Sequence, residues 1–311
     1  MTTGRVLHLE CAAGISGDMT VAALLDAGAD EGTVLRALDS LGVEGFQIRI
    51  SRVVKSGLDV CDFDVVLDER HENRDHDMAY LHGVDGGFGE DCSCDDVLGH
   101  AREHDGEHDG EHRHGRVHDH RRSRVHGRDH DHPHGHDHGH RSPSDIAALI
   151  DAADMSEGAR SIAHRVFDIL ADAEARAHGI DVADVHFHEV GAIDSIADVV
   201  AASAALDSLG VDDVIVTDLA EGSGTVRCQH GVIPVPVPAV VNIAARWSIP
   251  LRPSGVRGEL VTPTGAAFVA AVRTRSTLPE RFVIERVGMG AGKRDYATSG
   301  IVRAMVIREV R

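Results

Sequence analysis

Hydrophobic and polar residues recur with two different periods along the chain, and these periods divide it into predicted helices and strands. Residues 5–10 alternate between the two types and predict a strand, whereas 156–178 repeat apolar positions at helical spacing and predict one long helix. Five further segments favour helices: 18–28, 31–42, 146–152, 193–209 and 264–272. Six further segments favour strands: 46–54, 58–67, 185–188, 214–218, 282–287 and 301–307. This interleaved order predicts a mixed α/β or α+β fold.

Gly and Pro residues refine this division. The Ser-Pro-Ser sequence at 142–144 is a helix-start signal, because proline is favoured in the first turn of a helix. The stretch 222–238 is rich in Gly and Pro, and its prolines force an extended backbone.

The periodic pattern is lost over residues 71–140. This segment holds 17 of the chain's 23 histidines together with 17 acidic residues and 8 arginines, a net charge of −9. Low hydrophobicity with high charge cannot offset the entropy of ordering a chain. We therefore predict one large globular domain, formed by 1–70 and 142–311, that a disordered His- and Asp-rich insert over 71–141 interrupts.

The overall composition excludes several classes of protein. Acidic residues outnumber basic ones 51 to 31, for a formal charge of −20, whereas a nucleic-acid-binding protein needs a basic surface. No apolar run reaches the length of a transmembrane helix, no signal peptide is recognisable, and five scattered cysteines make no disulfide framework. We expect a cytoplasmic protein without nucleic-acid or membrane partners. With two lysines beside many acids, its surface also suggests adaptation to salt.

The first candidate site lies between the first predicted strand and the first predicted helix. Glycines let the backbone turn tightly and the free N–H groups of a helix start attract anions, so Gly14, Ser16 and Gly17 are candidate phosphate-binding residues. Asp18 is a candidate catalytic carboxylate that can coordinate a metal ion, unless it only caps the helix. A plain glycine-rich turn would account for the same residues.

The second candidate site begins with two histidines one residue apart. On a strand, His186 and His188 project to the same face and supply half of a site for Ni²⁺ or Zn²⁺, which Glu189 or Asp194 would complete. Glu189 and Asp194 are also candidate catalytic residues. Asp194 and Asp198, four residues apart, share one face of the next predicted helix. A polar strand end followed by an Asp cap is the alternative.

Two further motifs could hold a phosphate. Thr262, Thr264 and Gly265 open a predicted helix, where hydroxyl and N–H groups suit an anion, although capping explains them about as well. The glycine-rich stretch 288–295 ends in a Lys-Arg pair that could bind a phosphate, but by itself it favours a turn.

The predicted insert contains histidines at every second position. The six are His130, His132, His134, His136, His138 and His140. Neutral imidazoles at this density bind Ni²⁺, Zn²⁺, Cu²⁺ or Co²⁺ without a fold. We predict a metal-buffering tract, the alternative being a solvated tract with incidental affinity. It is not expected to be catalytic, because a disordered tract does not preorganise a reaction centre.

Taken together, these motifs resemble the LarC-type nickel-insertion proteins. The resemblance rests on Gly-Ile-Ser-Gly-Asp-Met at 14–19, His-Phe-His-Glu-Val-Gly-Ala-Ile-Asp-Ser at 186–195, Pro-Val-Pro at 234–236 and Thr-Pro-Thr-Gly-Ala-Ala at 262–267. A family turn, Gly-Tyr-Gly-Ala-Gly, is matched at 288–292 with Met in place of Tyr, and a His-rich insert is typical of the family.

The resemblance implies the last step of nickel-pincer cofactor synthesis, carried out by a lyase-type nickel chelatase or metallocyclase. Ni²⁺ is inserted into pyridinium-3,5-bisthiocarboxylic acid mononucleotide, and Ni–S and Ni–C bonds form in a reaction that requires CTP. The product serves nickel-pincer-dependent apo-enzymes such as lactate racemase.

The family pattern continues into a second domain, to which CTP binding with Mg²⁺ or Mn²⁺ is assigned. We expect that C-terminal domain to be absent from this chain and to be supplied by a separate C-terminal-half polypeptide. The sequence leaves a homo-oligomer open.

Two other functions remain possible on the residues alone. The His tract would suit a nickel or zinc storage protein or metallochaperone without catalytic activity. The glycine-rich turns would suit a nucleotide-dependent hydrolase.

Overall fold

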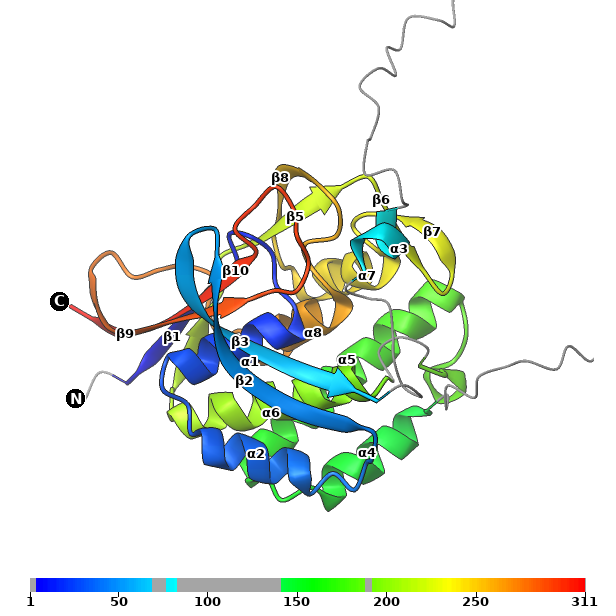
Figure 1. The fold of residues 1–311 in the computed structure, drawn as a ribbon, viewed down its shortest axis with the longest axis horizontal. Coiled ribbons are helices and arrows are strands. Elements are labelled where there is room, and N and C mark those ends of the chain that lie inside the picture. The colour runs from blue at the N-terminus through cyan, green and yellow to red at the C-terminus, as the bar shows by residue number, and fades with distance from the viewer. Residues whose placement is uncertain (1–3, 69–76, 83–140, 188–191, 311) are drawn as a thin grey trace, which may run out of the picture. The chain divides into compact units, whose positions relative to one another are not determined.

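A six-stranded sheet organises the fold, with the strand order β2-β3-β9-β10-β1-β4 (Figure 1). This computed structural model describes residues 4–68, 77–82, 141–187 and 192–310. Neighbouring strands are antiparallel, except that β3 and β9, and likewise β1 and β4, are parallel. The strands are β1 (Val6–Glu10), β2 (Phe46–Lys55), β3 (Leu58–Leu67), β4 (Asp213–Ile215), β9 (Phe282–Ala291) and β10 (Ile301–Glu309).

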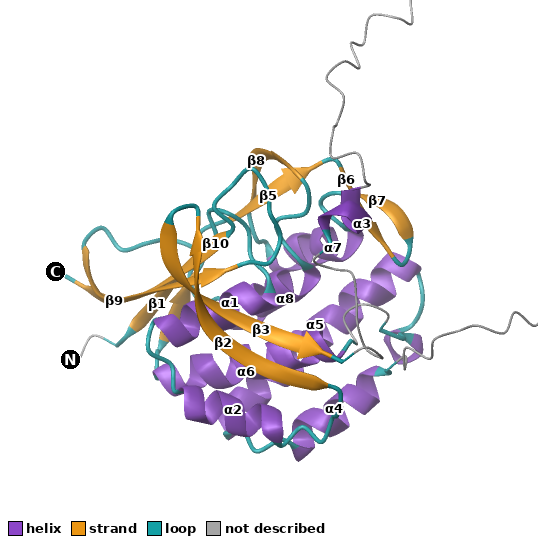
Figure 2. Ribbon diagram, viewed as in Figure 1, coloured by secondary structure: helices purple, strands orange, loops and turns teal. Residues whose placement is uncertain are grey.

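Helices pack against this sheet and against one another (Figure 2). In the described residues they are α1 (Gly17–Asp26), α2 (Glu31–Asp39), α3 (Met78–His82), α4 (Pro143–Ala152), α5 (Glu157–His178), α6 (Ile193–Leu209), α7 (Pro238–Trp247) and α8 (Pro263–Val272). Helix α1 lies on β3, β9 and β10, α6 packs on α1 and α2, and α5 packs on α6, α7 and α8. All described residues belong to one compact unit, so the segments on either side of the predicted insert fold together.

Two small sheets complete the architecture. Strands β5 (Leu219–Ser223) and β8 (Leu251–Arg257) pair in parallel, and β6 (Thr225–Cys228) and β7 (Gly231–Pro234) form an antiparallel hairpin. The extended backbone predicted for 222–238 is therefore largely β-structure.

Glycines explain how closely α1 approaches the sheet. A Cβ added to Gly288 would lie 2.1 Å from the Ala23 carbonyl oxygen, and one added to Gly290 would lie 2.1 Å from the Met19 carbonyl oxygen. Both glycines belong to β9, so the turn expected at 288–295 is wrong up to position 291. Here the glycines serve close packing of a helix on a strand.

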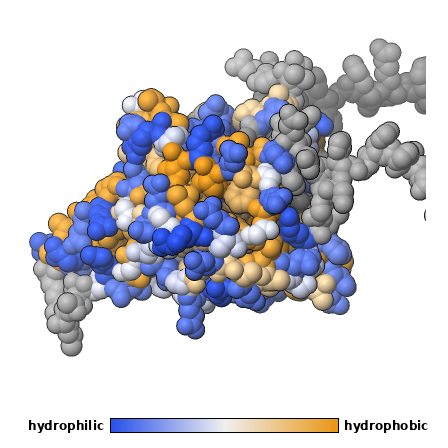
Figure 3. All heavy atoms as spheres, turned by 60° about the horizontal axis from the view of Figure 1, so that its bottom comes forward, coloured by the Kyte–Doolittle hydropathy of each residue, from blue (hydrophilic) through white to orange (hydrophobic). Residues whose placement is uncertain are grey.

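Small apolar residues build much of the core. Helices α6 and α8 are buried along most of their length, mainly through Ala and Val side chains. Small side chains allow a short distance between the axes of packed helices. On the face shown in Figure 3, apolar residues gather near the middle with hydrophilic residues around them. Among the described residues, every helix is too short or too polar to cross a membrane.

The mixed α/β class predicted from the sequence is confirmed, and several element boundaries are as expected. Helix α4 begins at the predicted signal, where Ser142 and Asp145 form a reciprocal capping box. The strand expected at 185–188 is wrong as far as it is described, because only Phe187 pairs, in an isolated bridge with Arg141. The structureless segment expected over 71–141 is wrong at 78–82, which form α3 against β6.

Candidate functional site

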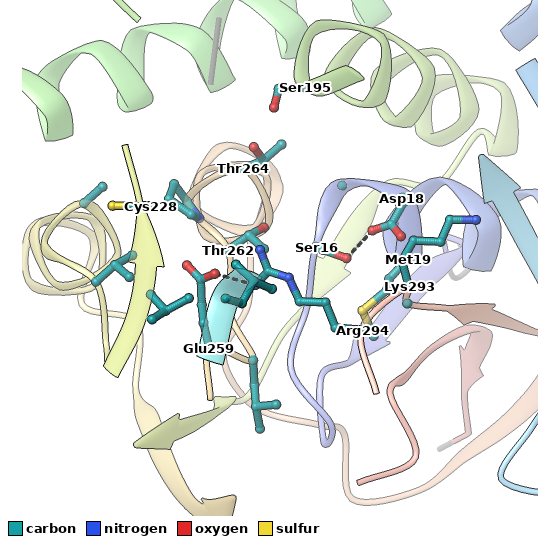
Figure 4. Close-up of a pocket in the computed structure, with 18 of the residues that line it drawn as sticks. Ser16, Asp18, Met19, Ser195, Cys228, Glu259, Thr262, Thr264, Lys293 and Arg294 are labelled. Atoms are coloured by element: carbon teal, nitrogen blue, oxygen red, sulfur yellow. Dashed lines mark hydrogen bonds and ion pairs between the residues drawn. The ribbon is translucent and has the colours of Figure 1, made fainter. Parts of the chain in front are cut away.

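A cavity of about 430 Å³ opens among α1, α5, α6, α8 and the β6–β7 hairpin. Its volume falls in the range of small-molecule sites, roughly 300–1,000 Å³. Figure 4 shows Asp18 and Cys228 on opposite sides of this pocket, with Thr262 and Thr264 between them. The first and third sequence motifs and the Asp194 end of the second thus meet at one place.

The first and third motifs are joined by their backbones. Ile15 donates to the carbonyl of Leu260 at 2.9 Å and accepts from the N–H of Thr262 at 3.0 Å. A Cβ on Gly14 would lie 2.1 Å from the Leu260 carbonyl oxygen, and one on Gly265 would lie 2.5 Å from the Ile15 carbonyl oxygen. The two glycines expected to admit a ligand therefore admit a neighbouring backbone instead, and neither lines the cavity.

Carboxylates gather at the start of α1. Asp18 stands in the first turn of α1, and Asp194 and Asp198 reach the same side of the cavity from α6. Gly17 makes room for this approach, since a Cβ there would lie 2.4 Å from Asp198 Oδ2. Ser16 does not cap the helix with its side chain but donates its hydroxyl to Asp18.

Two buried carboxylate oxygens in this group lack a partner. Within the described residues, Asp18 Oδ2 and Asp198 Oδ1 accept no hydrogen bond. Burial raises the pKa of Asp198 well above the ordinary value, and the charges of Asp18 and Asp194 raise it further, while Lys293 and the backbone N–H of Asp18 act in the opposite direction. A buried carboxyl that holds its proton this tightly, facing a cavity, is suited to proton transfer.

The chain's two lysines hold the loop beside this carboxylate group. Lys293 Nζ lies 2.6 Å from Asp62 Oδ1 and 3.3 Å from Asp64 Oδ1 on β3. Lys55 donates to the carbonyl of Arg294 at 2.9 Å and also to that of Gly292. Both side chains are largely buried, so the loop that follows β9 is fixed to the sheet.

The start of α8 forms the middle of the cavity wall. Thr262 accepts from the N–H of Gly265 and caps the helix, and Thr264 lies one residue inside the first turn. Arg294 points toward this wall and pairs with Glu259 (Figure 4). Both cations that the sequence offered to a phosphate, Lys293 and Arg294, are thus engaged with carboxylates.

Glu221 fixes the backbone that precedes α8, a role that was not predicted from the sequence. Its side chain is 2% exposed, and Oε1 accepts from the N–H groups of Gly222 at 2.7 Å, Leu260 at 3.0 Å and Val261 at 3.3 Å. Burial raises its pKa to about 7 against these hydrogen bonds.

A second group of polar side chains lies at the Cys228 end. Glu174 and His178 come from the last turns of α5, and Cys228 and His230 from the β6–β7 hairpin. His178 is exposed at the end of α5, and its side chain also lines the cavity. No spacing signal links α5 to the hairpin, and only the fold brings them together.

Of the predicted histidine site, only His186 and Asp194 lie within the described residues. His186 is exposed between the buried Val185 and Phe187, and it does not line the cavity. In the described part of the chain, no three His, Cys, Asp or Glu side chains stand close enough to hold a metal ion as they are. The other predicted metal ligands lie outside the described residues: His130, His132, His134, His136, His138, His140, His188 and Glu189.

Known proteins similar to this chain handle nickel. The sequence model of the family described as "Nickel insertion protein" matches residues 7–311. The "Pyridinium-3,5-bisthiocarboxylic acid mononucleotide nickel insertion protein" of Alkaliphilus metalliredigens is 43% identical over 98% of this chain and 61% of its own length. Proteins of the same name from Acetivibrio thermocellus and Geobacillus kaustophilus are 32% and 34% identical, over 97% and 98% of this chain and 60% of their own lengths.

The chain thus spans about three fifths of the length of these relatives. No solved structure matches it. The family match covers nearly the whole sequence, including each of the motifs that meet at the cavity. This chain belongs to the nickel insertion protein family.

Proposed function

We propose that this chain binds pyridinium-3,5-bisthiocarboxylic acid mononucleotide in the cavity and takes part in inserting Ni²⁺ into it, as a nickel-inserting lyase. The proposal is supported by the relatives' names and by one observation above all. Buried, partly unsatisfied carboxylates face a cavity of the right size for a mononucleotide.

The phosphate of the mononucleotide is best placed at the start of α8. Residues at the starts of both α1 and α8 line the cavity, and helix N-termini attract anions. At α1, however, Asp18 and Asp198 already supply negative charge, which disfavours a phosphate. The start of α8 offers the hydroxyl groups of Thr262 and Thr264 and the backbone N–H of Thr264, without a carboxylate in its first turn.

The carboxylates at the start of α1 are then available to accept the proton that the ring loses. When the Ni–C bond forms, the ring C–H bond breaks, its electron pair goes to nickel, and the proton needs an acceptor. Asp198 in its ionised form is that acceptor, because its raised pKa makes it a stronger base than an ordinary carboxylate. Asp18 and Asp194 add negative charge beside it and favour the incoming cation.

Other parts of the reaction rest on the resemblance. CTP with Mg²⁺ or Mn²⁺ would bind the family's other domain on a C-terminal-half polypeptide, and the product would pass to a nickel-pincer-dependent apo-enzyme. His186, His188 and Glu189 would hand over nickel, and the tract His130–His140 would load it.

Reconstitution tests the proposal. The chain, a C-terminal-half polypeptide, Ni²⁺, CTP and Mg²⁺ are incubated with the precursor mononucleotide, and the nickel-containing product is measured by mass spectrometry. We expect product with the wild-type chain and at least about a 100-fold slower rate with Asp198→Asn. Asp207→Asn, an exposed change on the same helix α6, is the matched control. Equal rates for wild type and Asp198→Asn would refute the assignment.

Storage of nickel is the second candidate, and the histidine-rich composition of the insert favours it. Deleting residues 87–136 separates the two functions and spares α3. If the chain inserts nickel, the deleted chain still makes the nickel-containing product when nickel is abundant. If the chain stores nickel, the deletion removes nearly all of its nickel binding.

A further inference from the structure

Donor side chains of two segments meet at the end of the cavity opposite Asp18. Glu174 and His178 project from the last two turns of α5, and Cys228 and His230 flank the turn between β6 and β7. We call these four residues the histidine–cysteine cluster. It shares the cavity with the carboxylate group but none of its residues.

Three distances place the donors of this cluster near one another. The rings of His178 and His230 lie 4.9 Å apart between centroids, and Cys228 Sγ lies 3.8 Å from His230 Nδ1. His178 Nε2 lies 3.6 Å from Glu174 Oε2. Metal ligand atoms lie about 2 Å from the ion, so these side chains would have to rotate to bring their donors onto one cation.

The chemistry of the donors suits nickel. Two imidazoles and one thiol are ligands of the borderline and soft type that Ni²⁺ accepts.

The site is incomplete, which fits transfer rather than storage. As they stand, no three donors in the described residues converge on a point. A cation held by two or three protein ligands keeps coordination positions open, and the sulfur atoms of a bound thiocarboxylate can occupy them. A closed four-ligand site would retain the metal.

We propose that the histidine–cysteine cluster is a transit site that holds Ni²⁺ inside the cavity before insertion. The proposal deepens the proposed function, because it gives the cargo a position within reach of the same bound precursor. A purely structural alternative exists: Glu174 and His178 form an i, i+4 pair that stabilises the end of α5.

A spectroscopic titration with nickel alone tests the site. The full chain carries Cys92→Ser and Cys94→Ser, so that Cys228 is its one cysteine besides the buried Cys11 and Cys61. Free Ni²⁺ is set with a metal buffer, which makes the result independent of nickel bound by the His tract. We expect a near-ultraviolet thiolate-to-nickel absorption band that saturates as free nickel rises.

Variants then assign the band. Cys228→Ser should abolish it, and His178→Gln with His230→Gln should raise the free nickel needed for half saturation at least about tenfold. His164→Gln, a half-buried α5 histidine paired with Asp151, is the matched control and should leave the band unchanged. Thermal melts verify that each variant is folded.

A band that is absent in the parent chain, or that survives in Cys228→Ser, overturns the proposal. The titration needs no precursor, CTP or partner chain. A nickel band together with failed insertion would therefore contradict the proposed function but not the transit site. Successful insertion without a nickel band would contradict the transit site but not the proposed function.

Discussion

Glu221 offers a quantitative test of how the cavity wall is built. The Glu221→Gln variant keeps an oxygen that can accept from Gly222, Leu260 and Val261 but removes the ionisable group. Burial moves the pKa of Glu221 from 4.5 to about 7. A difference of about 2.5 pKa units corresponds to about 3 kcal/mol between the protonated and ionised folded states.

The sign follows from proton binding. Between pH 4.5 and 7 the folded chain keeps the Glu221 proton and the unfolded chain has lost it, so this group's contribution to stability falls as pH rises. The contribution is fully present below pH 4.5 and lost above pH 7. The stability of Glu221→Gln relative to wild type should therefore grow with pH, by about 2.5 kcal/mol between pH 5 and pH 8.5.

Urea unfolding at a series of pH values measures this difference. The single tryptophan, Trp247, provides a fluorescence signal, and circular dichroism provides a second one. Comparison of the two proteins cancels every other titrating group that both share. A difference in unfolding free energy that stays constant from pH 5 to pH 8.5 would refute a protonated, buried Glu221.

Three further changes probe packing and charge. Gly290→Ala should cost about 1–3 kcal/mol in chemical denaturation, since its Cβ would meet the Met19 carbonyl. Gly32→Ala on α2 would meet only the side chains of Arg36 and Asp30, at 3.4 Å or more, and should be neutral or stabilising; equal effects would contradict the packing role. Lys293→Met leaves the largely buried Asp62 without its ion-pair partner, so the melting temperature should fall more at pH 7 than at pH 4, and an equal fall at both would count against the pair. Thermal stability should rise with KCl up to molar concentration if the acidic, lysine-poor surface is salt-adapted, and an unchanged melting temperature would argue against it.

The fold was predictable where local signals act alone. Helix α5 is capped at its start by Ser156, which accepts from the N–H of Ala159, and at its end by Gly179 in a left-handed conformation. Helix α7 and strand β8 were missed. For α7 the reason is that Pro234, Pro236 and Pro238 suggested an extended backbone, although Pro238 opens the helix. The glycines of β9 were misread as a turn, since a sequence does not distinguish a glycine that bends the chain from one that admits a helix.

The candidate site was predictable only in part. Asp18, Asp194 and the threonines of α8 were selected by motif, and the structure brings them to one cavity. The partnership of Asp198 with the start of α1, and that of His178 with the β6–β7 hairpin, depends on packing between elements that are distant in sequence. Such contacts leave no periodic trace, so they required the fold.

The pH dependence of single-turnover insertion tests the central claim most directly. The rate is measured with wild type and Asp198→Asn, using saturating precursor, nickel, CTP and the C-terminal-half polypeptide. If Asp198 accepts the ring proton, the wild-type rate rises with pH through a pKa above the ordinary carboxyl range. The Asn variant should lose this rise along with most of its activity. The same pH profile and the same rate in both proteins would contradict the account.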